Sequence, residues 1–322
     1  MRALSPRLPL SLSPHLLLLT AFFICACGAN AATYYLTVAG LGGEPDYEQH
    51  FAMWAGEIEG ILKASAGDAK IETLKGPSAT RAQVRSALEN IAREAKPQDA
   101  LVLMLIGHGS FDGFDYKINL PGPDLSGAEL ASLLDRVPAT RQLVVNMTSA
   151  SGGAADALRK ENRVVITATK TGTEHNATVF PRFWVEALRD PAADTDKNET
   201  ISALEAFHYA QHKIQEYYDS QKRLATEHAL LEDTGKARTS RTSAPEANEG
   251  LRAAAFPLVR LGAAKSLVND PEKQKFFEKK DQLEQQIDQL KFNKATMAAD
   301  EYKKQLTALL LELARTQQEL DK

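Results

Sequence analysis

The chain has 322 residues, which is enough for one large domain and an additional segment. Hydrophobic residues make up 43% of the chain and charged residues 25%, as in an ordinary soluble globular protein. The net charge of −4 excludes the strongly basic surface that nucleic-acid binding requires, so we expect no nucleic-acid partner.

The N-terminus has the pattern of a signal peptide. Arg2 and Arg7 precede an apolar run at 16–24, which is too short to span a membrane. The segment Ala29-Asn30-Ala31 fits an A-x-A cleavage site, so we expect a signal peptide at 1–31 and a protein exported to the periplasm or secreted. Cleavage removes two of 38 basic residues and none of 42 acidic ones, so the mature net charge is −6.

An alternative interpretation of the same segment is a lipoprotein signal in which Cys27 carries the lipid. Cys25 and Cys27 are the only two cysteines, and both lie in this segment. The folded domain therefore has no disulfide, no thiolate metal site and no cysteine nucleophile.

Short apolar runs alternate with amphipathic stretches from 33 to 170, a pattern that predicts a doubly wound, mostly parallel α/β sheet. The predicted strands are 33–41, 69–76, 100–107, 142–149 and 163–170. The predicted helices are 47–63, 80–95 after the cap Thr80, 126–134 with a Ser126–Glu129 capping box, and 154–160.

The C-terminal third is expected to be mainly helical. The segment 179–224 has helical spacing with a break at 190–198, and the α/β domain is expected to span 32–230. A polar stretch rich in turn formers predicts a flexible linker at 231–262. Apolar residues then recur at helical spacing on both sides of a break at 292–300, which predicts a hairpin with coiled-coil character at 263–322. The hairpin is a candidate surface for protein partners or for self-association, and the alternative is that it packs on its own domain or on itself.

Two strand ends carry unusual residues. Gly107-His108-Gly109-Ser110 follows one apolar strand, and the run from Asn146 to Gly153 follows the next. Sites form at the carboxyl ends of strands in such sheets. Histidine is the usual acid or base near neutral pH, and backbone amides at a small-residue turn can form an oxyanion hole. Structural explanations, a histidine in a turn and a capped helix start, stay open.

Together the two loops resemble the clan CD cysteine peptidases, which include legumain, caspases and gingipains, and most of all a bacterial legumain-like branch. The sequence LVLMLIGHG matches the motif in which an apolar strand ends in His-Gly, and VVNMTSASGG matches the segment that carries the cysteine. The resemblance covers about 33–230 and implies a caspase/hemoglobinase-like fold. It aligns Ser149 with the missing cysteine.

The resemblance also implies roles for individual residues. His108 corresponds to the general acid or base, and the amides of Gly109 and Ser149 to oxyanion donors. Loops after later strands shape the specificity pocket, where Glu174 and Thr169 are the candidate substrate-binding residues. Asp112 or Glu174 are the candidates to orient His108, because a serine needs an oriented base in contact with it.

Two functions remain open. The chain is a pseudo-peptidase that binds peptides or protein partners without cleaving them, or an active peptidase with Ser149 as nucleophile and His108 as base. No cofactor is required for either function.

A separate loop has the spacing of an EF-hand calcium loop. Asp194, Asp196, Asn198, Thr200 and Glu205 are its candidate calcium ligands, although Glu199 occupies the position where glycine is usual. A capping box formed by Ser202 and Glu205 is the alternative explanation of the pattern.

Overall fold

The structure is a computed structural model that describes residues 31–65, 67, 69–236, 250–262, 264 and 271–321. The predicted signal peptide, with Cys27 and the alternative lipid site, lies outside the described residues, except for Ala31 at its end. Most of the polar stretch of the predicted linker, at 237–249, lies outside them as well.

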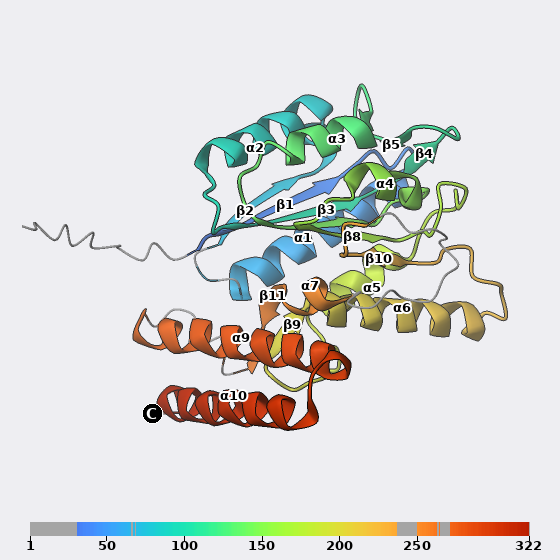
Figure 1. Ribbon diagram of the computed structural model, residues 1–322. Coiled ribbons are helices and arrows are strands. Elements are labelled where there is room, and N and C mark those ends of the chain that lie inside the picture. Colours follow the sequence, from blue (N-terminus) through green and yellow to red (C-terminus); the bar gives the residue numbers. More distant parts are fainter. Residues whose placement is uncertain are drawn as a thin grey trace, which may run out of the picture. The chain divides into compact units, whose positions relative to one another are not determined.

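A six-stranded sheet in the order β10-β8-β7-β3-β1-β2 forms the centre of the domain (Figure 1). Its strands are β1 (Thr33–Ala39), β2 (Lys70–Leu74), β3 (Ala100–Ile106), β7 (Arg141–Asn146), β8 (Arg163–Thr167) and β10 (Leu230–Glu232). Only β10 pairs antiparallel with its neighbour; the other pairs are parallel. The strand order reverses between β1 and β3, which places the topological switch point at the carboxyl ends of these two strands.

Helices cover both faces of the sheet, which confirms the doubly wound α/β prediction. One face packs on α1 (Pro45–Ser65), α5 (Phe180–Ala187) and α6 (Ala203–Ser220). The other face packs on α2 (Arg81–Glu94), α3 (Gly127–Leu134) and α4 (Ala155–Leu158).

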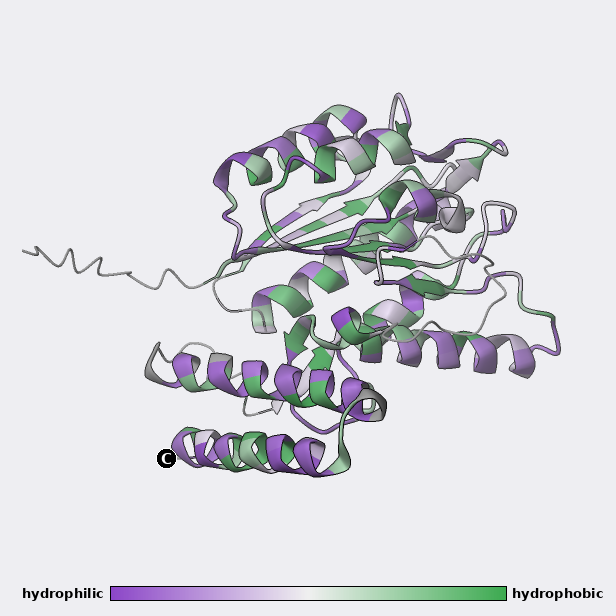
Figure 2. Ribbon diagram, in the orientation of Figure 1, coloured by the Kyte–Doolittle hydropathy of each residue, from purple (hydrophilic) through white to green (hydrophobic). Residues whose placement is uncertain are grey.

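Strand β3 shows why its sequence is apolar throughout. Val102, Met104 and Ile106 belong to the first core, and Leu101 and Leu103 with the rest of the alternate set belong to the second. Each such buried side chain stabilises the fold by about 1.5–3 kcal/mol. Figure 2 shows the resulting pattern, with apolar strands between helices that are hydrophilic on their outer sides.

The helix starts agree with the predicted caps, with one difference. Thr80 caps α2 and Ser126 caps α3 through their hydroxyl oxygens. Ser202 and Glu205 form the full capping box of α6. Ser126 and Glu129 form only half of one, because the Glu129 carboxylate pairs with Arg81 and Arg85 instead.

Several short elements are absent from the sequence prediction. A three-stranded sheet follows β3 and consists of β4 (Gly109–Phe111), β5 (Tyr116–Ile118) and β6 (Leu125–Ser126). The 3₁₀ helices η1 (Gly76–Ser78) and η2 (Ser151–Ala154) are also new, and η2 with the short α4 replaces the predicted helix at 154–160. Strands of two or three residues carry too little periodicity to be predicted.

The predicted linker at 231–262 is partly wrong. Its described part holds the end of β10, then α7 (Leu251–Ala254) and β11 (Pro257–Arg260), and β11 pairs with β9 (Thr200–Ser202). The buried Asp233 carboxylate accepts hydrogen bonds from the backbone amides of Gly250, Arg252 and Ala253. The α/β domain therefore continues to β11.

The C-terminus forms the predicted helical hairpin. Helices α9 (Pro271–Phe292) and α10 (Ala299–Leu320) pack against each other, and η3 (Asn293–Thr296) lies at the predicted break. The predicted repeat residues Leu283, Ile287 and Leu290 are buried. Among the described residues, no helix is both long and apolar enough to cross a membrane.

Candidate functional site

The two loops singled out in the sequence meet at the carboxyl edge of the sheet. His108 and Gly109 follow β3, and Ser149 follows β7, the next strand in the sheet. The loops are in direct contact, because Ser149 hydrogen-bonds to Gly109. The parallel register of β3 and β7, with Leu105 opposite Asn146, brings the two loops together.

The Ser149 side chain is hydrogen-bonded to the backbone of the neighbouring loop. Its Oγ accepts a hydrogen bond from Gly109 N at 3.0 Å and donates one to Gly109 O at 3.1 Å. The residue is only 2% exposed. The Ser149 hydroxyl therefore donates its proton to the Gly109 carbonyl. The Gly109 amide, a candidate oxyanion donor, already donates its hydrogen bond to the Ser149 hydroxyl.

A buried polar cluster supports the turn before Ser149. Thr148 Oγ1 bonds to Tyr116 Oη at 2.6 Å, to Asn146 Oδ1 at 2.9 Å and to the Ser149 carbonyl at 3.0 Å. Burial raises the pKa of Tyr116 to about 12, so its hydroxyl stays protonated. Tyr116 was missed in the sequence, because it lies on the short β5, which has no recognisable signal.

His108 lies against aromatic rings of α1. Its ring is in edge contact with Tyr47 at 4.7 Å and with Phe51 at 5.1 Å between centroids. Burial lowers the pKa of His108, and this effect outweighs the opposing hydrogen bond to the Gly42 backbone and the nearby Glu44 carboxylate. Burial therefore favours the neutral form of the imidazole.

The candidate catalytic residues are neighbours but are not joined. Within the part of the chain that the structure describes, no hydrogen bond links His108 to Ser149. The two candidate orienting residues bond elsewhere. Asp112 accepts from the amides of Phe114 and Asp115 in its own turn, and Glu174 pairs with His228 at 2.7 Å.

The predicted substrate-binding residues lie in the loop after β8, next to the Ser149 loop. The Glu174 carboxylate also accepts from the amides of Lys170 and His228, and its carbonyl accepts from Ala150 N. Thr169 is fully buried, and its Oγ1 accepts from Gly152 N and donates to Thr171 O. In this structure both residues hold the loops together.

The glycines of these loops allow close packing. A Cβ on Gly109 would lie 2.5 Å from Ser149 O, so no larger residue fits between the two loops. Gly153 and Gly172 both lie against the ring of Phe111, where a Cβ would come within 2.6 Å and 2.3 Å of ring atoms. The β4–β5 hairpin is therefore packed tightly on the Ser149 loop.

Glu227 is a buried acid in the segment between α6 and β10. It is 2% exposed and accepts from the amides of Val179 and Phe180, at the start of α5, and from Tyr218 Oη. Burial raises its pKa to about 7, while the three hydrogen bonds oppose the shift. Its position was not predictable, because Glu227 is distant in sequence from the helix it caps.

The candidate calcium loop lies between α5 and α6, as the EF-hand pattern requires. Ligand atoms of Asp194, Asp196 and Glu205 lie within 4.8 Å of one another. Glu199, where glycine is usual, adopts the left-handed conformation with φ of 64°. The loop thus makes the turn that the motif needs, at the cost of strain at a residue with a Cβ.

The remaining candidate ligands are held by hydrogen bonds within the loop. Asn198 N donates to Asp194 and Asp196, and Thr200 N donates to Asn198 Oδ1. The Glu205 carboxylate accepts from Thr195 N and from the amide and hydroxyl of Ser202. The loop geometry and the capping box therefore coexist, and of the five candidate ligands the structure groups the three carboxylates of Asp194, Asp196 and Glu205.

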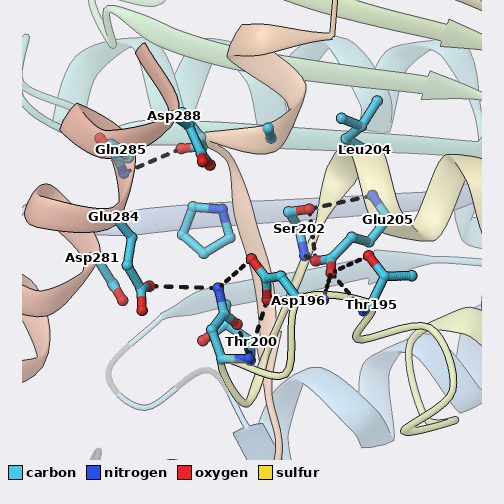
Figure 3. A pocket seen from close by; sticks show the side chains of 14 residues that line it. Thr195, Asp196, Thr200, Ser202, Leu204, Glu205, Asp281, Glu284, Gln285 and Asp288 are labelled. Carbon is cyan, nitrogen blue, oxygen red and sulfur yellow. Dashed lines mark hydrogen bonds between the residues drawn. The ribbon is translucent and has the colours of Figure 1, made fainter. Parts of the chain in front are cut away.

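A pocket of about 190 Å³ separates this loop from α9 (Figure 3). Asp196 and Glu205 line it from the loop, and Asp281, Glu284 and Asp288 line it from α9. Burial and neighbouring carboxylates raise the pKa of Asp196 to about 6, and burial raises that of Glu284 to about 7.

Comparison with known proteins gives similarity in fold only. No family model and no curated protein matches the chain. Caspase-1 from Spodoptera frugiperda is 12% identical, with a TM-score of 0.44 over 63% of this chain and 86% of that chain. Protein GSU0716 from Geobacter sulfurreducens is 13% identical, with a TM-score of 0.43 over 65% and 95%. The Drosophila initiator caspase Dronc is 8% identical, with a TM-score of 0.42 over 63% and 80%.

Proposed function

We propose that this chain is an exported pseudo-peptidase that binds peptides or protein partners at the carboxyl edge of its sheet and does not cleave them. The observation that carries the proposal is the pair of hydrogen bonds between Ser149 Oγ and the backbone of Gly109. A serine nucleophile needs a base in contact with its hydroxyl, and here the proton is donated to a carbonyl.

The alternative is an active peptidase with Ser149 as nucleophile and His108 as base. The lowered pKa of His108 favours it, because a neutral imidazole can accept a proton. The alternative requires Ser149 to leave Gly109 and turn to His108, and the Gly109 amide to be released for the oxyanion.

Incubation of the mature protein with a peptide library and a fluorophosphonate probe separates the two functions. The pseudo-peptidase binds peptides, leaves them intact and takes no label. Cleavage or labelling that disappears in both Ser149→Ala and His108→Ala would establish the peptidase and end our proposal. Ser149→Cys is the informative gain-of-function variant, because a thiolate is a stronger nucleophile at neutral pH than a serine hydroxyl.

We also propose that the loop from Asp194 to Glu205 binds calcium. The left-handed turn at Glu199 and the three clustered carboxylates support this second function. Calcium titration of the mature protein, followed by calorimetry, tests it. Heat that is lost in Asp194→Asn supports calcium binding, and absence of heat at about millimolar calcium contradicts it.

Export to the periplasm or the extracellular space, with Cys27 lipidation as an alternative, is part of the proposal. Its support is the N-terminal sequence alone. Mass spectrometry of the mature N-terminus distinguishes a chain that starts at Ala32 from one that starts at a lipidated Cys27. The helical hairpin is the surface that we propose for recruitment of partners or for self-association.

A further inference from the structure

Asp99 is a buried carboxylate at the amino end of β3. The residue is 4% exposed and directly precedes the strand. Its Oδ2 accepts a hydrogen bond from Lys96 N at 2.7 Å, and its Oδ1 accepts one from Ala32 N at 2.9 Å. In the described part of the chain, no lysine, arginine or histidine side chain pairs with this carboxylate. Aspartate is rarely buried without a cation beside it, so the missing partner needs an explanation.

The nitrogen that donates to Asp99 Oδ1 belongs to the residue at which the mature chain is expected to begin. Cleavage after Ala31, at the A-x-A site, converts the Ala32 amide into an α-ammonium group. A free α-amino group has a pKa of about 7.7–8.0, so it is mostly protonated at pH 7. Cleavage therefore replaces a neutral donor to Asp99 by a charged one, and charge-assisted hydrogen bonds are about twice as strong as neutral ones.

The position of Ala32 is set by residues that remain after cleavage. The Ala32 carbonyl accepts a hydrogen bond from Ala100 N at 2.9 Å, and Thr33 lies opposite Ala100 in the parallel pair of β1 and β3. The Ala32 side chain packs against the second core of the domain. The new ammonium group therefore forms next to the Asp99 carboxylate without any rearrangement of the sheet.

We propose that Asp99 is the binding site for the α-ammonium group of the mature chain, so that removal of the signal peptide forms a buried ion pair. This inference rests on the proposed export with cleavage after Ala31. The pair links the amino ends of β1 and β3, the two adjacent strands that lie at the switch point of the sheet. A chain that starts at a lipidated Cys27 has no ammonium group at this position, so the buried Asp99 supports the start at Ala32.

Two full-length forms of the mature protein test the pair, because they differ only in where the ammonium group lies. One chain starts at Ala32, and the other starts at Ala29 and has an amide at Ala32. Urea denaturation is expected to give a folding equilibrium constant about tenfold higher for the chain that starts at Ala32. Asp99→Asn should reduce this difference to less than about twofold. Asp115→Asn, at an exposed aspartate in the turn between β4 and β5, is the matched control and should keep the full difference.

Labelling of the α-amine is a second measurement that needs no variant, and it decides the question even if Asp99→Asn does not fold. An amine-selective acylating reagent near pH 7 favours the α-amine over lysine, because lysine has a pKa of about 10.4. Mass spectrometry of the N-terminal peptide gives the rate. The folded chain that starts at Ala32 should be labelled about tenfold more slowly than the same chain in urea, and the chain that starts at Ala29 should show no such protection.

The outcomes separate the ion pair from the export on which it rests. Exported protein that starts at a residue other than Ala32 contradicts the proposed cleavage and the pair together. A start at Ala32 with equal folding constants for the two chains, or with an unprotected α-amine, overturns the pair and leaves export standing. A difference between the two chains that persists in Asp99→Asn overturns Asp99 as the binding site.

Discussion

Replacement of Ser149 by alanine tests whether its hydroxyl holds two loops together. The change removes both hydrogen bonds to Gly109, and the methyl group can replace neither. A buried polar group left without a partner costs about 1–3 kcal/mol. Water can reach part of Gly109, which is half-buried, so we expect a total loss of about 2 kcal/mol of unfolding free energy.

Urea denaturation of the mature protein measures this loss, and a thermal scan should show a decrease in melting temperature of roughly 4–8 °C. Ser110→Ala is the matched control. Ser110 follows Gly109 directly and is exposed. Its replacement by alanine is expected to change the unfolding free energy by less than about 0.5 kcal/mol.

A Ser149→Ala variant as stable as Ser110→Ala would refute the reasoning, because the hydroxyl would then have no structural role. Combined with loss of a measured peptidase activity, that result would favour Ser149 as a nucleophile. Reduced stability with no activity to lose is the outcome that the pseudo-peptidase predicts.

Three further predictions concern neighbouring residues. Gly172→Ala should lower the unfolding free energy, measured by urea denaturation, by about 1–3 kcal/mol, because its Cβ would lie 2.3 Å from the Phe111 ring. The double variant with Phe111→Ala should lose less unfolding free energy than the sum of the two single variants. The pKa of Glu227 is about 7 in the folded protein against an ordinary 4.5, so protonation of Glu227 favours the folded state. The unfolding free energy should therefore fall by about 3 kcal/mol as pH rises from 4.5 through 7. In Glu227→Gln the unfolding free energy should depend less on pH, and an equal pH dependence in the variant and wild type would contradict the raised pKa of Glu227. An NMR titration of His108 should give a midpoint below 6.5, and Tyr47→Ala should move it upward by exposing the ring; a midpoint that stays unchanged would mean that α1 does not desolvate the imidazole.

Strong local patterns allowed much of the fold to be predicted. The apolar run of β3 was identified because both faces of the strand are buried, and Thr80 and Ser202 marked helix starts because a side-chain oxygen there satisfies a free amide. The β4–β6 sheet and β11 were missed. Their strands have two to four residues, too few to show a clear alternating pattern, and β11 also depends on pairing with the distant β9.

The candidate site was predicted in part. The positions of His108 and Ser149 at adjacent strand ends follow from the order of apolar runs. The orientation of their side chains does not. The His108 ring packs against Tyr47 and Phe51, and the Ser149 hydroxyl is hydrogen-bonded to the Gly109 backbone. Both arrangements depend on how separate helices, strands and loops pack against each other.

The sequence by itself determined the α/β class, the absence of cysteine from the folded domain, the two strand-end loops and the acidic pattern of the loop from Asp194 to Glu205. These features depend on residue type and short spacing. The tertiary structure alone decided that Ser149 bonds to Gly109, that Glu227 is buried, and that Glu284 of α9 faces Asp196. Such contacts join residues tens of positions apart, and their free energy depends on distance and burial that no local pattern encodes.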